Sequence, residues 1–236
     1  MNIAGLQKMT LLDYPGRVAC TVFLQGCNFR CPFCHNSDLL PVKGEVLMTD
    51  AELLAFLKKR QGMLDGVCIT GGEPTLQKEL PNLLKDIKAQ GYCVKLDTNG
   101  ANPGLLKHVV ESGYVDYVAM DIKNSPERYG ETAGVSAHLL QPVSESIQFL
   151  TEGHVDYEFR TTVVEELHNA ESVQSMGAWM HDLAGGKKVK RWFLQSFVDR
   201  ESVLFSNLNP PKVEDLRQYA EILTQYAWEV GLRGVD

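Results

Sequence analysis

The chain has 236 residues, and 23 Lys or Arg against 30 Asp or Glu give it a formal net charge of −7. This length suits one domain with a core of its own, and the acidic balance argues against a nucleic-acid-binding surface. Because residues 1–9 lack a secretory pattern and no apolar run approaches the roughly 20 residues of a membrane span, we expect a cytoplasmic protein with neither nucleic acid nor membrane as partner.

Short apolar segments alternate with amphipathic ones, which is the pattern of βα units around a parallel sheet. The expected strands are residues 18–25, 66–70, 93–98, 117–122, 157–164 and 191–197. The expected helices are residues 49–60, 77–90, 103–112, 136–151, 170–183 and 213–230. Six such units are fewer than the eight that close a βα barrel.

Three cysteines, Cys27, Cys31 and Cys34, lie close together directly after the first expected strand. Thiolates gathered in a loop usually hold a metal. Three of them favour a 4Fe–4S cluster with one open iron, because a structural zinc site closes its shell with four ligands. Cys20 or His35 could supply a fourth ligand, so zinc remains the alternative.

The other cysteines, Cys20, Cys68 and Cys93, lie inside expected strands, where we predict core thiols. In the cytoplasm, six cysteines favour metal or redox chemistry over a framework of disulfides.

Polar or flexible residues follow several expected strands, at the end where parallel α/β sheets bind ligands. These residues are Gly71, Gly72, Glu73 and Pro74; Asp97, Thr98 and Asn99; and Asp121 and Lys123. The two glycines let the backbone approach a ligand, and Glu73 presents a carboxylate at the sheet's edge. Each group has an alternative interpretation as an ordinary turn that caps its strand.

Arg160 lies within a run of strand-forming residues, where an unpaired guanidinium would be costly to bury. Its planar guanidinium suits a ligand carboxylate in bidentate geometry. The alternative is a structural ion pair with one of the many acidic residues.

The spacing Cys-x3-Cys-x-aromatic-Cys, with Phe33 as the aromatic residue, resembles the signature of radical S-adenosylmethionine (SAM) enzymes. The segments at residues 13–17 (Asp-Tyr-Pro-Gly-Arg), 26–28 and 34–36 (Cys-His-Asn) are similar to the activases of glycyl-radical enzymes. More closely, they resemble the activating proteins of anaerobic ribonucleoside-triphosphate reductase.

This resemblance covers nearly the whole chain and implies a fold. We expect an α/β protein, a partial (β/α)6 TIM-type barrel with mostly parallel strands. Residues 1–236 would form one radical SAM domain, in which residues 1–17 approach the barrel and residues 18–236 form it.

The resemblance also implies a site. One 4Fe–4S cluster is expected on Cys27, Cys31 and Cys34, with SAM bound to its open iron. The expected SAM contacts are Phe33, Gly71, Gly72, Glu73, Pro74, Asp97, Thr98, Asn99, Asp121, Lys123, Arg160 and Gln195. In the family, the Gly-Gly-Glu-Pro motif holds the methionyl amino group, and the Asp-Thr-Asn-Gly and Asp-x-Lys segments line the ribose and methionine ends. In some members those two segments hold a monovalent cation. Arg160 is the candidate for the methionyl carboxylate.

The implied reaction is reductive cleavage of SAM to methionine and a 5′-deoxyadenosyl radical, which takes a hydrogen atom from a glycine of a partner enzyme. No second set of thiols follows the cysteine loop, so we expect an external electron donor such as flavodoxin or ferredoxin. Pyruvate formate-lyase activases carry a Pro-aromatic-His segment where this chain has Gln195 and Ser196, which favours the reductase as partner.

Three alternatives stay open. The chain could activate another glycyl-radical enzyme, of the pyruvate formate-lyase type, or it could be a radical SAM enzyme that modifies a small molecule. A metal-binding or electron-carrier module without catalysis is the third, and it leaves the residues after the later strands unexplained.

Overall fold

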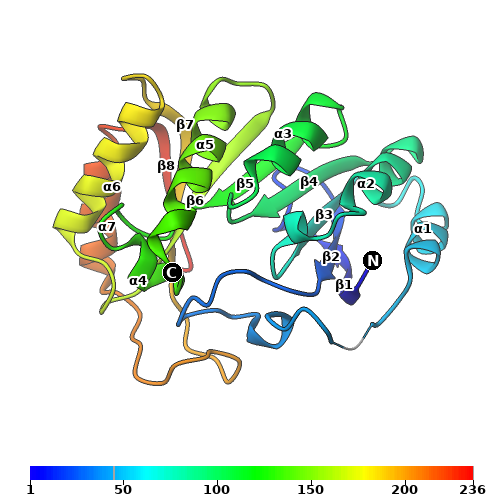
Figure 1. Cartoon of the computed structure of the whole chain (residues 1–236), viewed down its shortest axis with the longest axis horizontal. Coiled ribbons are helices and arrows are strands. Elements are labelled where there is room, and N and C mark those ends of the chain that lie inside the picture. The colour runs from blue at the N-terminus through cyan, green and yellow to red at the C-terminus, as the bar shows by residue number, and fades with distance from the viewer. Residues whose placement is uncertain (45, 236) are drawn as a thin grey trace. The chain divides into compact units, whose positions relative to one another are not determined.

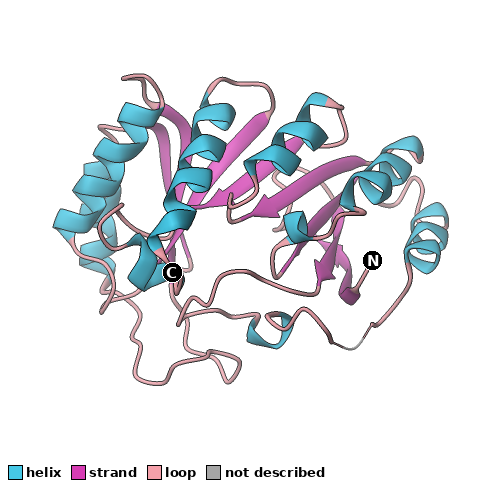
Figure 2. Cartoon of the chain, viewed as in Figure 1, coloured by secondary structure: helices cyan, strands magenta, loops and turns pink. Residues whose placement is uncertain are grey.

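The computed structural model describes residues 1–44 and 46–235, and it divides into two compact units. Unit 1 comprises Met1–Asn28, Asp38–Thr98 and Gly104–Ala119, and unit 2 comprises Phe29–Ser37, Asn99–Pro103 and Met120–Asp236. Helices and strands alternate along most of the chain (Figures 1 and 2).

The strands are β1 (Ile3–Thr10), β2 (Ala19–Leu24), β3 (Gly66–Gly71), β4 (Cys93–Thr98), β5 (Tyr117–Asp121), β6 (Asp156–Val163), β7 (Val189–Ser196) and β8 (Ala227–Arg233). The α-helices are α1 (Asp50–Lys58), α2 (Leu80–Ala89), α3 (Pro103–Glu111), α4 (Tyr129–Ala133), α5 (Leu140–Thr151), α6 (Ala170–Leu183) and α7 (Val213–Leu223). Short 3-10 turns occur at Ser37–Leu39, Pro74–Leu76 and Ala137–Leu139.

Among the described residues, the eight strands follow one another in the sheet in chain order, from β1 to β8. β1 runs antiparallel to β2, whereas β2 with β3, β3 with β4, β6 with β7 and β7 with β8 are parallel pairs. The α/β class and the mostly parallel, open sheet are therefore confirmed.

Local sequence explains where the helices start. Thr49 caps α1: its Oγ1 accepts from Glu52 N at 3.2 Å, and Glu52 Oε2 accepts from Thr49 N at 2.8 Å. This reciprocal capping box satisfies two amide groups that the first helical turn leaves unpaired. Leu53 and Leu57 are then fully buried on the inner face of the helix.

At the two ends of the sheet, the elements differ from those that the sequence predicts. Part of the expected approach segment forms β1, and the expected helix over residues 213–230 ends at Leu223 and is followed by β8. Pairing with β7 draws these last residues into the sheet. Gly231 makes the pairing possible, because a Cβ atom there would lie 2.7 Å from the Phe193 ring. Tertiary pairing thus overrides the local helical pattern.

The core of unit 1 includes a cluster of Tyr14, Ala19 and Tyr117, against which Cys93 packs. The two tyrosine rings lie 6.0 Å apart, and a Cβ atom at Gly66 would come within 2.9 Å of the Tyr14 ring. Burial raises the pKa of Tyr14 above its ordinary value. Tyr14, from the segment at residues 13–17, therefore belongs to the core of unit 1.

The predicted core thiols agree with the structure in two cases out of three. Cys20 and Cys68 are fully buried, whereas Cys93 is half-buried. Burial raises the pKa of the Cys20 thiol to about 12, so it stays protonated at neutral pH.

Within the described residues, no helix has both the length and the apolar character of a membrane span.

Candidate functional site

The part of the cysteine loop in unit 2 packs on the end of α4. Arg30 N donates to Ala133 O at 3.0 Å, and Cys31 Sγ lies 3.6 Å from the same oxygen. Gly134 has a φ of +64°, and a Cβ atom there would overlap the Arg30 carbonyl. A glycine at this helix end is therefore required for the loop to approach.

A second segment, residues 197–205, holds the same loop. His35 Nε2 lies 2.7 Å from Val198 O, and the His35 ring stacks on Phe197 at 5.6 Å with an interplanar angle of 3°. Ser202 Oγ donates to His35 O at 2.7 Å. His35 therefore has partners of its own. Because Cys20 is buried inside β2, both residues that could have completed a zinc site are engaged elsewhere.

The thiols fit an iron–sulfur cluster by their chemistry. The six cysteines, all in the described part of the chain, are free thiols. Cys31 is buried, whereas Cys27 and Cys34 are half-buried. Among residues 1–44 and 46–235, no three His, Cys, Asp or Glu side chains are grouped as metal ligands would be. The choice of these three cysteines therefore rests on their spacing and on how the loop is held.

The Gly-Gly-Glu-Pro segment of unit 1 contacts the residues that lead into the cysteine loop. Glu73 N donates to Gly26 O at 2.7 Å, and Gly72 N donates to Leu24 O at 2.9 Å. A Cβ atom at Gly71 would overlap the Leu24 backbone, and one at Gly72 would overlap Gly26 O. Both glycines are thus needed for this close backbone approach.

Glu73 is buried, with 1% of its surface exposed. Its Oε1 atom accepts from Thr75 N at 3.0 Å, Thr75 Oγ1 at 2.5 Å and Thr98 Oγ1 at 2.7 Å. The carboxylate therefore links the turn after β3 to the end of β4 through uncharged donors, and Pro74 starts the short 3-10 turn that carries Thr75. In the structure, Thr98 is therefore a hydrogen-bond donor to Glu73.

The remaining residues after β4 differ in their surroundings. Asp97 pairs with the Lys95 ammonium group on the same strand. Asn99, in unit 2, accepts from Ala101 N at 2.9 Å through its Oδ1 atom, as in a local turn.

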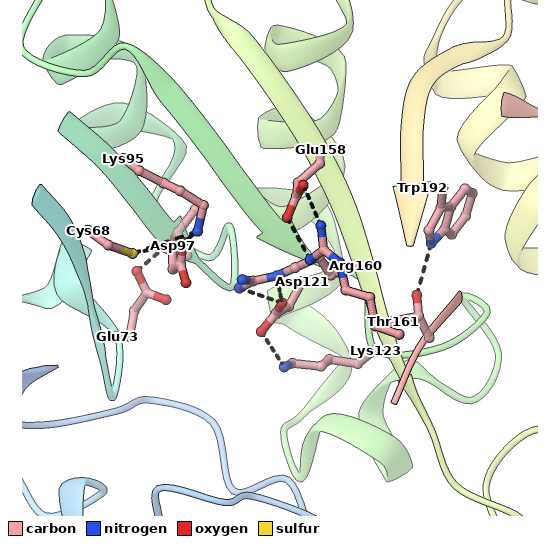
Figure 3. A network of polar contacts seen from close by, with 12 residues as sticks. Cys68, Glu73, Lys95, Asp97, Asp121, Lys123, Glu158, Arg160, Thr161 and Trp192 are labelled. Atoms are coloured by element: carbon pink, nitrogen blue, oxygen red, sulfur yellow. Dashed lines mark hydrogen bonds and ion pairs between the residues drawn. The ribbon is translucent and has the colours of Figure 1, made fainter. Parts of the chain in front are cut away.

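In unit 2, Asp121 lies between two cations (Figure 3). Arg160 Nε and Nη2 each lie 3.0 Å from Asp121 Oδ1, and Lys123 Nζ lies 3.0 Å from Oδ2. Burial alone would raise the pKa of Asp121, but Arg160 and Lys123 outweigh it and hold the pKa at about 2. Burial opposes the charge of Lys123, whereas Asp121 outweighs it and raises the Lys123 pKa. The ion pair that the sequence left open for Arg160 is thus formed with Asp121.

Two further residues of the predicted site lie in unit 2. The Lys123 ammonium group lies 5.9 Å from the centroid of the Phe33 ring, within the range of a cation–π contact. Gln195 is half-buried on β7, where its register neighbours are Thr162 on β6 and Arg233 on β8.

The sequence did not single out two other polar groups. Glu158 is buried and pairs with Arg233 through two contacts of 3.0 and 2.9 Å, and the Arg233 guanidinium lies 3.9 Å from the centre of the Phe193 ring. His168 is also buried, and its Nε2 atom lies 2.9 Å from Lys123 O. A charge inside an apolar strand was the available signal for Glu158. Arg233 was missed because it follows the expected helix over residues 213–230, where the sequence predicted no strand.

Solved structures with the same fold belong to several enzymes. A domain of the pyruvate-formate lyase-activating enzyme from Bacteroides vulgatus superposes with a TM-score of 0.57 at 22% identity, covering 72% of this chain and 99% of that chain. Streptococcus suis SuiB bound to S-adenosylmethionine gives a TM-score of 0.68 at 15% identity, covering 89% and 48%. At these identities the likeness establishes the fold.

Residues 21–174 match the model of the Radical SAM superfamily. Because the match spans more than half of the chain, this protein belongs to the radical SAM superfamily. It is an enzyme whose cofactors are a 4Fe–4S cluster and SAM.

Two relatives that match over nearly their whole length are named as activating enzymes. A glycyl-radical enzyme activating enzyme of Methanocaldococcus jannaschii is 28% identical, with 99% of this chain and 96% of the relative covered. The pyruvate formate-lyase 1-activating enzyme of Escherichia coli is 27% identical, with 97% of each covered.

Proposed function

We propose that this radical SAM enzyme is an activase that generates a glycyl radical on anaerobic ribonucleoside-triphosphate reductase. The observation that carries the activase assignment is similarity to two activating enzymes over at least 97% of this chain and 96% of each relative. A small-molecule enzyme or an electron carrier has no comparable support in these full-length matches.

In this proposal Cys27, Cys31 and Cys34 would hold the cluster, and the polar residues that follow the strands would hold SAM. When bound, the cluster and SAM supply a 5′-deoxyadenosyl radical that removes a hydrogen atom from a glycine of the partner enzyme. The protein contributes the loop that carries the thiols, since α4 contacts it at Arg30 and Cys31 and residues 197–205 contact it at His35.

The SAM contacts are divided between groups of opposite charge. Glu73 receives the methionyl ammonium group, and the Gly71–Gly72 backbone lies beside it. Asp121, Lys123 and Arg160 together carry one net positive charge, which suits the methionyl carboxylate. Asp97, Thr98, Asn99, Phe33 and Gln195 complete the proposed contacts.

The target rests on a narrower observation. The end of β7 carries Gln195 and Ser196, and no Pro-aromatic-His segment occurs there as in pyruvate formate-lyase activases. The names of several relatives favour pyruvate formate-lyase as the second candidate. With one cluster in the chain, the electron comes from an external donor such as flavodoxin or ferredoxin.

The test is to mix anaerobically reconstituted protein, a reductant and SAM with each candidate partner and to record electron paramagnetic resonance spectra. We expect a glycyl-radical doublet on the reductase and formation of 5′-deoxyadenosine. Changing Cys27, Cys31 or Cys34 to Ala abolishes the cluster and the doublet. Cys68→Ala is the matched control: it removes a buried thiol and costs roughly 1 kcal/mol of packing, while the cluster remains.

The outcomes separate the parts of the proposal. A doublet on pyruvate formate-lyase alone would replace the target and keep the activase class. Efficient turnover of a small molecule without any doublet would overturn the class. Stoichiometric zinc without iron after anaerobic preparation would overturn the cluster assignment.

A further inference from the structure

The Lys95 side chain is buried next to Asp97, one of the proposed SAM contacts. Lys95 is 1% exposed, although it carries an ammonium group, and it is among the largest fully buried side chains of the molecule. Burying such a charge is costly unless it is paired. Its presence in the middle of β4 therefore calls for a specific partner.

That partner is Asp97. Lys95 and Asp97 are two residues apart on β4 and so point to the same face, where Nζ forms an ion pair with Asp97 Oδ1 (Figure 3). Cys68 lies opposite Lys95 in the β3–β4 register, with its Sγ atom 3.7 Å from Nζ and 3.8 Å from Asp97 Oδ1. The ammonium group thus lies between a thiol and a carboxylate.

The Cys93 end of β4 also favours an orientation of the Lys95 side chain toward Asp97. Cys93 precedes it by two residues on the same face and packs against the cluster of Tyr14, Ala19 and Tyr117. That end of β4 is aromatic and apolar, whereas the Asp97 side chain is 13% exposed at the other end. An ammonium group placed between them is directed toward the carboxylate.

A monovalent metal ion at Asp97 would have to share this carboxylate with an ammonium group already in contact with it. Two like charges on one carboxylate repel each other strongly where water is excluded. Asp121, the other carboxylate for which the family resemblance allows a cation, has Lys123 and Arg160 as partners in its own unit. The donor set of each carboxylate therefore fits a side-chain cation.

We propose that Lys95 is the built-in counter-ion of Asp97, and that this protein consequently binds SAM without a sodium or potassium ion at that carboxylate. The inference rests on the proposed SAM site. Lys95 acts as a positioning residue: it fixes Asp97 and neutralises its charge from within the sheet.

The experiment measures the dissociation constant of SAM for the reconstituted protein without oxygen, in choline chloride, sodium chloride and potassium chloride at equal ionic strength. We expect wild-type values to agree within about twofold. In Lys95→Met, Asp97 loses its counter-ion, so binding should weaken about tenfold or more in choline chloride and recover as potassium or sodium is added. Lys88→Met is the matched control, because it breaks an ion pair with Asp116 elsewhere in unit 1.

A saturable requirement of the wild type for sodium or potassium would overturn the inference. So would Lys95→Met protein that binds SAM in choline chloride as tightly as the wild type does. If Lys95→Met fails to fold, sodium-23 magnetic resonance of the wild type decides: line broadening that appears with SAM overturns the inference, and unchanged lines support it. Wild-type protein that binds no SAM in any salt would overturn the proposed SAM site, and this inference with it.

Discussion

Glu73 in unit 1 and Asp121 in unit 2 are both carboxylates that lie just after or at the end of a strand, yet they are held in different ways. Three donors of its own unit, all uncharged, converge on one oxygen of Glu73. Asp121 is contacted by the guanidinium of Arg160 and the ammonium of Lys123. The first arrangement fixes a carboxylate through neutral groups, whereas the second balances its charge.

The difference matters for what each carboxylate can do. Hydroxyl and amide donors orient Glu73 and add no positive charge, so an ammonium group is a fitting ligand for it. The charged partners of Asp121 lower its pKa. Together, Asp121, Lys123 and Arg160 form a group with one net positive charge. The proposed assignment of the methionyl ammonium group to Glu73, and of the methionyl carboxylate to the group around Asp121, follows from this difference in charge.

The largest expected effect comes from removing the charge of Asp121. Asp121→Asn leaves Arg160 and Lys123 without this carboxylate, and we expect a loss of about 2 kcal/mol in the free energy of unfolding. This value lies below that of a fully buried pair, because the Asp121 side chain is 33% exposed. Urea unfolding of the cluster-free protein measures it. A change below about 0.5 kcal/mol would remove the contrast with Glu73.

A more local change tests Glu73. Glu73→Gln keeps an acceptor for Thr75 and Thr98 and removes the charge, so SAM should bind roughly ten- to a hundredfold more weakly while the fold is retained. Equilibrium binding of SAM to the reconstituted protein measures this. Thr75→Val is the matched control: it removes one hydroxyl donor to Glu73, costs about 1 kcal/mol of stability, and should change SAM affinity by no more than about threefold. Equal losses in the two variants would make Glu73 a structural residue.

The smallest effect is a dependence on pH. Because the folded pKa of Asp121 is about 2 and its unfolded value is about 3.9, the unfolded chain takes up a proton first as the pH falls. The contribution of Asp121 to stability is therefore complete above about pH 5 and decreases as the pH falls toward 2. The difference in unfolding free energy between wild type and Asp121→Asn, measured at pH 7, 5 and 3, should be constant over the first interval and smaller at pH 3. A difference that does not decrease would contradict the assigned charge balance.

Much of the fold could be predicted because buried parallel strands appear in the sequence as short apolar runs. The β4 bounds are identical to the predicted ones, and β3 differs by a single residue. β8 escaped prediction because residues 213–230 continue a helical pattern that only pairing with β7 interrupts. β1 escaped because its pairing with β2 is irregular, with register shifts on both sides of the run from Gly5 to Gln7.

The partners of the site residues were harder to predict, since they come from distant parts of the chain. Thr98 reaches Glu73 from 25 positions away, and Asp121 lies 39 positions from Arg160. Lys95 beside Asp97 was visible as two charges on one face of an expected strand. The sequence does not say that the lysine is buried, or that Cys68 of the neighbouring strand lies opposite it.

The glycine at position 72 has a practical consequence. Its missing side chain allows Glu73 N to bond to Gly26 O, one residue before Cys27. A methyl group at position 72 would overlap Gly26 O and would therefore displace the backbone beside Cys27. It would leave every cysteine unchanged. Gly72→Ala would thus change the surroundings of Cys27, a proposed cluster ligand, while all three cysteines of the loop stay in the sequence.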